Sequence, residues 1–216
     1  MIELVILLLA SYITGSFPTS IIVIRVTKNI DIREHGSGNA GATNVFRVLG
    51  WKYAVFVLTF DIFKGWLPTA VYATTIFQQL PVPDQGLVQI LCGFAAVFGH
   101  TFPIFAGFRG GKGVSSLIGV LLALFPLALP ICLLVGIVVI ITTGYVSLGS
   151  ISAAVALPII FLILPRLGLI NPSLFLIVFS LLVPWFIIYT HRSNISRIRN
   201  GTENRFEKAI IFKKKN

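Results

Sequence analysis

The chain has 216 residues, of which 56% are hydrophobic and only 11% charged, and its mean hydropathy is +0.94. Soluble domains are about a quarter charged, so this composition excludes a water-soluble globule as well as a disordered, collagen-like or coiled-coil chain. The two cysteines, Cys92 and Cys132, lie inside apolar runs and do not indicate a disulfide scaffold. The composition predicts an integral membrane protein built from helices.

The formal net charge is +10, which in a soluble protein would suggest a nucleic-acid partner. Here the basic residues collect in three segments: five in Arg25–Lys52, two at Arg109 and Lys112, and eight in Arg192–Lys215. The segment Gln78–Gly86, which separates two long apolar runs, has none. This distribution follows the positive-inside rule, and it predicts membrane orientation, contact with membrane lipids and no nucleic-acid partner.

The first apolar run, Ile2–Ile24, is long enough for a spanning helix, which needs about 20 residues. No basic residue precedes it and it is longer than a signal-peptide core, so we expect a retained span whose N-terminus lies outside. Arg25–Lys52 follows as a cytoplasmic loop. Two further spans are expected at about Tyr53–Phe77 and Leu87–Phe108, joined by an outer turn and followed by the cytoplasmic turn Arg109–Gly113.

Arg166 is the only charged residue between Val114 and Thr190, a stretch that begins and ends on the basic side. Its number of spans must therefore be even, and its length allows four. The turns are expected at Leu124–Pro130, Thr142–Ser152 and Arg166–Pro172. The sequence thus predicts an all-α polytopic membrane protein of about seven spans, or five if Val114–Thr142 is re-entrant or interfacial. No repeat or linker divides residues 1–216, so we expect one domain whose residues 191–216 form a basic cytoplasmic tail.

The polar clusters of the chain all fall on the predicted cytoplasmic side. The first runs from Ser37 to Asn44 and is followed by Arg47. Its glycines and small polar side chains are suited to turning backbone N–H groups toward an anion at a helix start, and Arg47 could bind a phosphate with two hydrogen bonds. A solvated loop with a helix cap explains the same residues about equally well. Candidate phosphate ligands are Ser37, Gly38, Asn39, Gly41, Thr43, Asn44 and Arg47.

The second cluster, Phe108–Ser116, again places a glycine-rich segment and a lysine before a helix. It is not a Walker A loop, because Gly113 stands where Ser or Thr is needed after Lys112, so nucleotide hydrolysis is not inferred. A tight turn with a lysine reaching the interface is the plainer interpretation. Two such loops on one side favour phosphate binding, here by Gly110, Gly111, Lys112 and Gly113.

Further polar residues lie at or inside the expected spans. If the last span continues as a helix, His191, Asn194 and Ile195 share a face, where they could act on a substrate or anchor the helix end. Asp61 and Lys64 are three residues apart inside the second expected span, a spacing that allows an ion pair. His100, near the cytoplasmic end of the third, either faces a ligand or packs in the core.

The chain lacks several patterns found in other enzymes. No histidine is followed by Asp five positions later, so the His–Asp dyad of acyltransferases that use soluble donors is missing. No Cys or His spacing indicates zinc, and the acidic residues are too few for a two-metal phosphatase. Among enzyme reactions, these absences leave one on phosphorylated substrates that needs no metal or other cofactor. A transporter of phosphorylated solutes is an alternative, although no repeated halves are present, and a phosphatidyl transferase would need acidic metal ligands.

Taken together, four ordered motifs resemble the bacterial acyl-phosphate:glycerol-3-phosphate acyltransferase family. The resemblance runs from about Gly15 to Glu203. The motifs are Ser37–Asn44 with Arg47, then Asp61-x-x-Lys64-Gly65, then Gly99–Phe105 running into Phe108–Gly113, and finally His191-Arg192-x-Asn194-Ile195-x-Arg197 with Gly201 and Glu203.

The resemblance implies transfer of a fatty acyl group from acyl phosphate to glycerol 3-phosphate at the cytoplasmic face of the bacterial inner membrane, with seven spans. The products would be 1-acyl-glycerol 3-phosphate (lysophosphatidate) and phosphate, for phospholipid biosynthesis, and another enzyme would supply the acyl phosphate. It associates Gly110–Gly113 with glycerol 3-phosphate. It implies that Ser37 and Arg47 are needed for activity, that His191 and Asn194 are the His and Asn of the last motif, and that Glu203 is structural. We expect Ser37, Arg47, Lys112, His191 and Asn194 to be catalytic, with Asp61, Lys64, His100 and Glu203 as supporting residues.

Overall fold

The computed structural model describes residues 2–76, 80, 82, 84–207 and 210. Within these residues every regular element is helical and no strand occurs, which confirms the predicted all-α class. The helices form two compact units, Met1–Leu124 and Phe125–Asn216. The single domain over 1–216 stays a prediction.

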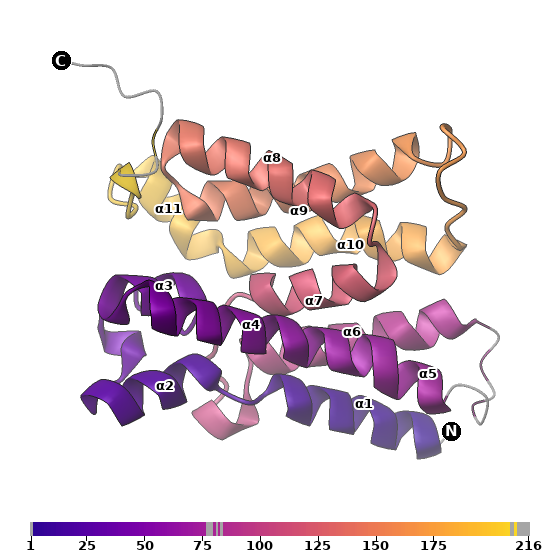
Figure 1. Cartoon of the computed structure of the whole chain (residues 1–216), viewed down its shortest axis with the longest axis horizontal. Helices are drawn as coiled ribbons and strands as arrows, with labels where there is room; N and C mark the ends of the chain where they lie inside the picture. Colours follow the sequence, from indigo (N-terminus) through magenta and orange to yellow (C-terminus); the bar gives the residue numbers. More distant parts are fainter. Residues whose placement is uncertain (1, 77–79, 81, 83, 208–209, 211–216) are drawn as a thin grey trace. The chain divides into compact units, whose positions relative to one another are not determined.

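The first unit is built from long apolar helices and short connecting helices (Figure 1). Helix α4 packs against α7 and α3, and α1 packs against α6. In chain order the elements are α1 (Ile2–Gly15), α2 (Thr19–Lys28), the 3₁₀ turn η1 (Ile32–Glu34), α3 (Ala42–Leu49), α4 (Trp51–Leu67), the π-helical stretch η2 (Pro68–Tyr72), α5 (Ala73–Ile76), α6 (Gln85–Thr101), the 3₁₀ turn η4 (Ile104–Ala106) and α7 (Val114–Leu124).

Glycines allow α4 and α7 to approach each other closely. A methyl group at Gly65 would collide with the carbonyl oxygen of Ser116, and one at Gly119 would collide with that of Ile62. Small residues at such contacts let helix backbones meet directly, and this raises the van der Waals packing on which helix association in lipid depends. The pair α4–α7 therefore forms a fixed support for the loop that precedes α7.

The predicted first span is interrupted. Helix α1 ends at Gly15 and α2 begins at Thr19, so the expected continuous run Ile2–Ile24 is broken over residues 16–18, and the helical chain extends to Lys28. The cause is Pro18, which lacks an N–H group and disfavours helical geometry at the residue before it. This break exposes the carbonyl of Phe17 to a side chain of α4.

The second unit contains α8 (Ala128–Thr143), α9 (Val146–Ile163), α10 (Leu174–Thr190) and α11 (Arg192–Arg199). Helices α8 and α9 pack together, and α9 packs against α10 (Figure 1). The first two expected turns fall within their predicted ranges, at residues 125–127 and 144–145. The third covers residues 164–173 and so extends beyond the predicted Arg166–Pro172 at both ends. The last span does not continue straight: α10 and α11 meet at 59° around His191.

Helix length and composition give four or five membrane spans among the described residues. Four described segments are long and apolar enough to cross a membrane, Ile2–Lys28, Trp51–Ile76, Gln85–Ala106 and Val146–Ile163, and the bent pair α10–α11 would make a fifth. Helices α7 and α8 are shorter, and the 11 residues of α7 rise only about 16 Å. Seven spans stay a prediction, and much of the expected outer turn Gln78–Gly86, with Phe77, lies outside the described residues.

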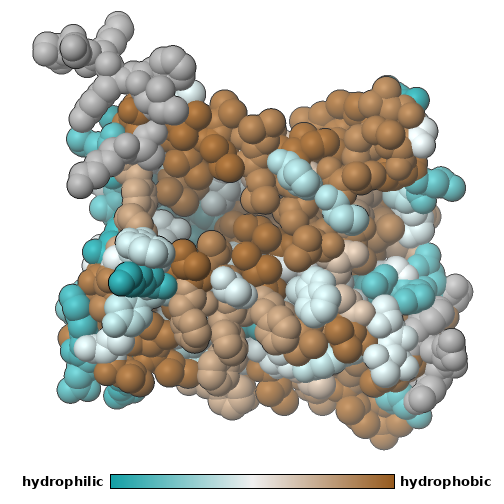
Figure 2. Space-filling model, in the orientation of Figure 1, coloured by the Kyte–Doolittle hydropathy of each residue, from teal (hydrophilic) through white to brown (hydrophobic). Residues whose placement is uncertain are grey.

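The surfaces of the long helices are apolar. Figure 2 shows one face on which hydrophobic side chains dominate and hydrophilic ones gather toward the helix ends. Large apolar side chains such as Leu134, Leu162 and Trp185 are exposed on these helices. Apolar patches of this extent are typical of surfaces that contact lipid.

Candidate functional site

The first glycine-rich loop, residues 35–41, is organised by the buried side chain of Asn44 at the start of α3. Asn44 Oδ1 accepts a hydrogen bond from the backbone N–H of Ser37 at 2.9 Å. Its Nδ2 donates to the carbonyl oxygens of Ile32, His35 and Asn39 at 2.8–3.2 Å. The side-chain amide is thus engaged with the loop itself, and Asn44 shapes the segment that presents Ser37.

Glycine is required at one position of this loop. Gly36 has φ +62°, and a Cβ there would collide with Asn44 Oδ1. Left-handed backbone of this kind is readily adopted by glycine and costs other residues free energy. The loop conformation is therefore specified by a glycine and an asparagine that fit together.

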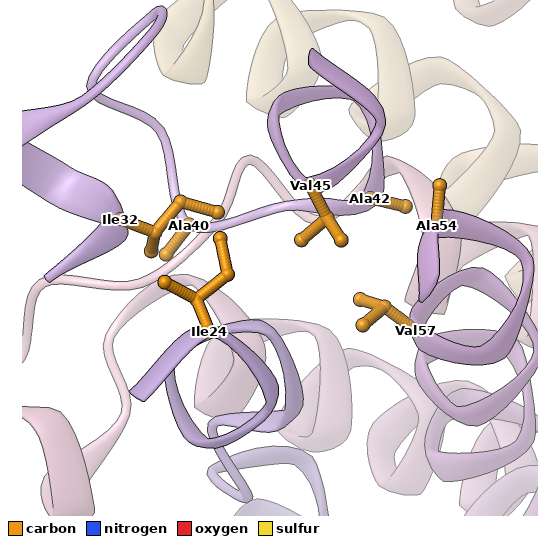
Figure 3. Packing of buried hydrophobic residues seen from close by; sticks show 7 residues of the cluster. All are labelled: Ile24, Ile32, Ala40, Ala42, Val45, Ala54 and Val57. Carbon is orange, nitrogen blue, oxygen red and sulfur yellow. The ribbon is translucent and has the colours of Figure 1, made fainter. Parts of the chain in front are cut away.

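Beneath the loop lies a small apolar core that joins it to α2, α3 and α4. Ile24, Ile32, Val45 and Val57 are fully buried, and Ala40 of the loop packs among them (Figure 3). Burying side chains of this size contributes about 1.5–3 kcal/mol each. The loop is consequently held by packing on one side and by Asn44 on the other.

The second glycine-rich loop, residues 107–113, runs from η4 into α7. The backbone N–H of Gly110 donates to the Thr101 carbonyl and that of Gly111 to the His100 carbonyl, both at 3.1 Å. The sequence predicted that these two N–H groups bind phosphate. In the structure they instead tie the loop to the end of α6. Lys112 follows them immediately, its side chain half-buried, and Gly113 leads into α7 with φ +84°.

The two glycine-rich loops meet at Gly111. A Cβ at Gly111 would lie 3.0 Å from the carbonyl oxygen of Ala40 and would collide with His100 Nε2. Only a residue without a side chain leaves the loops this close together. The structure therefore brings the segments before Asn44 and around Lys112, 68 residues apart in sequence, to one place in the first unit.

A buried polar cluster borders the second loop. Lys64 Nζ lies 2.8 Å from Asp61 Oδ1, which confirms the ion pair predicted from their spacing, and His100 Nδ1 lies 3.7 Å from the same oxygen. Lys64 also donates to the Phe17 carbonyl at the break between α1 and α2, at 2.9 Å. The three side chains line a hollow of about 220 Å³, counting its open part, together with Ala40, Gly110 and Gly111.

In the second unit, Glu203 holds the candidate residue Asn194 in place. The carboxylate accepts hydrogen bonds from Asn194 Nδ2 at 2.6 Å, Arg197 Nε at 2.7 Å and Ser147 Oγ at 2.9 Å. Burial opposes ionisation of this group, but the three hydrogen bonds outweigh that effect and keep the pKa of Glu203 below its ordinary value. Glu203 is thus an ionised anchor for the residues after α10.

His191 lies at the bend between α10 and α11 and is buried. Its Nδ1 is 2.8 Å from the Ile187 carbonyl oxygen, which can only accept, so Nδ1 must hold the proton of that hydrogen bond. In the neutral ring the lone pair is then on Nε2. His191 and Asn194 are both buried, and Ile195 is half-buried. The shared face was expected for a span that continues as one helix, and the bend at His191 breaks that helix.

Sequence reasoning missed some residues that the structure connects to these sites. Ser147 is the partner of Glu203, and the pair is 56 residues apart, so only the fold joins them. Arg33, with Asp31, links the first loop to the end of η4. The Asp31-x-Arg33 spacing beside the first motif was the available signal for that link. The half-buried Arg47 lies on α3, close in sequence to the first loop.

Comparison with known proteins agrees with this arrangement. Residues 5–201 match the model of the glycerol-3-phosphate acyltransferase family. The chain is 44% identical to the glycerol-3-phosphate acyltransferase of Chlorobium chlorochromatii, over 95% of this chain and 97% of that one. It is 41% identical to that of Chlorobaculum tepidum over the whole length of both.

Solved structures give the same result. The chain is similar to PlsY (YgiH), an integral membrane glycerol 3-phosphate acyltransferase, in its glycerol 3-phosphate form, with a TM-score of 0.80 and 35% identity. Its lysophosphatidic acid form gives a TM-score of 0.78 and 34% identity, and each match covers 94% of this chain and 95% of the other. The apolar helices, the polar loops and these relatives together show that the chain belongs to the glycerol-3-phosphate acyltransferase family of integral membrane enzymes.

Proposed function

We propose that the enzyme transfers a fatty acyl group from acyl phosphate to glycerol 3-phosphate, giving 1-acyl-glycerol 3-phosphate and inorganic phosphate. The observation on which this rests is the contact of two glycine-rich loops at Gly111 and Ala40 in the first unit. Both substrates contain a phosphate, and two adjacent loops, each with a cationic residue close in sequence, are suited to hold one phosphate each. The glycerol 3-phosphate and lysophosphatidic acid forms of PlsY support the acceptor and the product.

In this proposal the second loop binds glycerol 3-phosphate. Lys112 supplies the charge directed at the phosphate, and Gly113 with the first turn of α7 supplies the positive end of a helix. Gly110 and Gly111 contribute by shaping the loop, since their N–H groups already donate to carbonyl oxygens at the end of α6. The cluster Asp61, Lys64 and His100 supports this loop from below.

The first loop then binds the phosphate of the acyl donor. Ser37 and Thr43 offer hydroxyl groups, and Asn39 and Gly41 offer backbone N–H groups. The N–H groups of Ser37 and Gly38 already donate within the loop, so Gly38 contributes by shaping it. Asn44 fixes this arrangement, and Arg47 adds a positive charge. Holding two substrates side by side removes much of the entropic barrier to their reaction. A thioester donor would leave one of the two phosphate sites unused.

The chemical step is a direct acyl transfer. The glycerol hydroxyl oxygen forms a bond to the acyl carbonyl carbon, the bond from that carbon to the phosphate oxygen breaks, and the hydroxyl proton ends on the departing phosphate. Lys112, Arg47 and Ser37 are proposed to stabilise the oxyanion that forms on the way. His191 and Asn194 are proposed as further catalytic residues, with Glu203 positioning Asn194.

The location of the reaction follows from the charge distribution. We propose that the loops face the cytoplasm of a bacterial inner membrane, with the N-terminus outside and the residues after His191 inside. Fifteen of the 17 basic residues lie in the segments Arg25–Lys52, Arg109–Lys112 and Arg192–Lys215, and none lies in Gln78–Gly86. An enzyme that makes acyl phosphate must supply the donor on the same side.

The donor is tested by assaying purified protein in detergent with glycerol 3-phosphate and either palmitoyl phosphate or palmitoyl-CoA. We expect palmitoyl phosphate to yield lysophosphatidate and an equal amount of phosphate in the presence of EDTA and without ATP, and palmitoyl-CoA to be a poor donor. Reactions without glycerol 3-phosphate control for spontaneous hydrolysis. Equal turnover with palmitoyl-CoA, or loss of activity in EDTA, would contradict the proposal.

A further inference from the structure

An arginine binds the segment before the first loop to the end of η4. Arg33 lies in η1, and its Nη1 donates to the Ala106 carbonyl oxygen at 2.9 Å. Ala106 directly precedes the second loop. The hydrogen bond therefore joins the residues just before the first glycine-rich loop to the residues just before the second.

Asp31 fixes the orientation of this guanidinium. Arg33 Nε lies 3.0 Å from each carboxylate oxygen of Asp31, and Nη2 lies 2.6 Å from Oδ2. The hydrogen bond with Arg33 is the main reason that the pKa of Asp31 falls to about 2, so the carboxylate is ionised at neutral pH. The positive charge of Arg33 is thereby paired, which makes Arg33 poorly suited to bind a phosphate.

The backbone around Arg33 is in turn tied to the first loop. Asn44 Nδ2 donates to the Ile32 carbonyl at 3.2 Å while Asn44 Oδ1 accepts from Ser37. Ile32 is fully buried in the apolar core under the loop (Figure 3). Arg33 therefore moves with the first loop, and Ala106 moves with the second. If the hydrogen bond between them were lost, the second loop could shift relative to Ser37.

We propose that Arg33, oriented by Asp31, is a positioning residue that sets the distance between the two glycine-rich loops and so aligns the two substrates for acyl transfer. This inference rests on the proposed function, in which each loop holds one phosphate. The contact of Gly111 with Ala40 prevents the loops from coming closer, and the hydrogen bond of Arg33 prevents them from separating. An arginine is required because lysine cannot pair with a carboxylate through two nitrogens and reach a third acceptor at once.

The proposal predicts a loss in kcat. In Arg33→Lys each loop still binds its substrate, so both KM values change little, but the reacting atoms are misaligned. A displacement of about 1 Å can cost on the order of a hundredfold in rate, so we expect kcat to fall about ten- to a hundredfold. Asp31→Asn should give a smaller loss of the same kind, and the double variant should be no worse than Arg33→Lys.

The experiment measures kcat, both KM values and the unfolding midpoint of each purified variant in detergent, with palmitoyl phosphate as donor. Lys28→Met is the matched control, because Lys28 also donates to a backbone carbonyl, that of Val48, but does not join the two loops. We expect the control to keep the wild-type kcat. Added methylguanidinium should restore part of the kcat of Arg33→Ala, whereas methylammonium should not.

The other outcomes are distinct. A rise in one KM with kcat unchanged would make Arg33 a ligand of that substrate, and a lowered unfolding midpoint with normal kinetics of the folded fraction would make it structural only. Either result would overturn the proposal, as would an equal loss in Lys28→Met. If Arg33→Lys does not accumulate, Asp31→Asn is used in its place. A lower kcat with unchanged KM values would support the proposal, and an unchanged kcat would overturn it. Turnover of palmitoyl phosphate by the wild-type enzyme in the same series tests the proposed function separately.

Discussion

Replacing Lys64 with methionine is expected to lower the amount of folded protein sharply, because it leaves the carboxylate of Asp61 buried without its cation. Only 5% of the Lys64 side chain and 2% of the Asp61 side chain are exposed. Removing one partner of such a pair typically costs about 3–5 kcal/mol. Asp61→Asn should have a comparable effect, since it leaves the ammonium of Lys64 buried and unpaired.

The double variant Asp61→Asn, Lys64→Met should recover part of the loss but not all of it. Lys64 also donates to the Phe17 carbonyl at the break between α1 and α2, and methionine leaves that oxygen without its donor. Lys52→Met is the control, because Lys52 lies on the same helix α4 but is exposed. The measurement is the monodisperse fraction after detergent extraction, with the unfolding midpoint. Single variants that fold normally but are inactive would instead place the pair in the reaction.

Replacing Lys112 with alanine is expected to raise the KM for glycerol 3-phosphate by about ten- to a hundredfold. The reason is the loss of a charge-assisted contact with phosphate, which is worth about 1.5–3 kcal/mol, and about 1.4 kcal/mol corresponds to a factor of ten in affinity. The KM for palmitoyl phosphate should change little, because that substrate is assigned to the first loop.

The control for Lys112 is available in the same loop. Arg109 is exposed three residues earlier, so Arg109→Ala removes an equal charge from the same segment and should leave the KM for glycerol 3-phosphate nearly unchanged. The unfolding midpoints of both variants are compared with that of the wild type. If Lys112→Ala raised only the KM for the acyl donor, the assignments of the two loops would be reversed.

Much of the fold could be predicted because hydropathy reports helices directly. The turns around Pro126, Gly144 and Gly168 and the ion pair of Asp61 and Lys64 follow from local composition and from spacing within one helix. The break before Thr19 was missed, although Pro18 gave a signal for it. A long apolar run hides such a break, because average hydropathy does not register a missing N–H group.

The site could be predicted in its residue types but less well in their roles. Asn44 was interpreted as a phosphate ligand, yet its amide is engaged within the loop, and the N–H groups of Gly110 and Gly111 are similarly engaged with carbonyls. Whether a polar group in a glycine-rich motif faces a ligand or its own backbone depends on the folded loop. Contacts between distant segments, such as Ser147 with Glu203 or Arg33 with Ala106, depend on tertiary structure alone.

The central claim is that the enzyme holds two phosphates at once, one on each glycine-rich loop. It is tested most directly by titrating glycerol 3-phosphate calorimetrically into purified enzyme saturated with a palmitoyl phosphonate, a non-transferable analogue of the acyl donor. We predict that one glycerol 3-phosphate binds per chain with undiminished affinity, and that Lys112→Ala weakens this binding while leaving the affinity for the phosphonate unchanged. Displacement of the phosphonate by glycerol 3-phosphate would show a single shared phosphate site and would contradict the account.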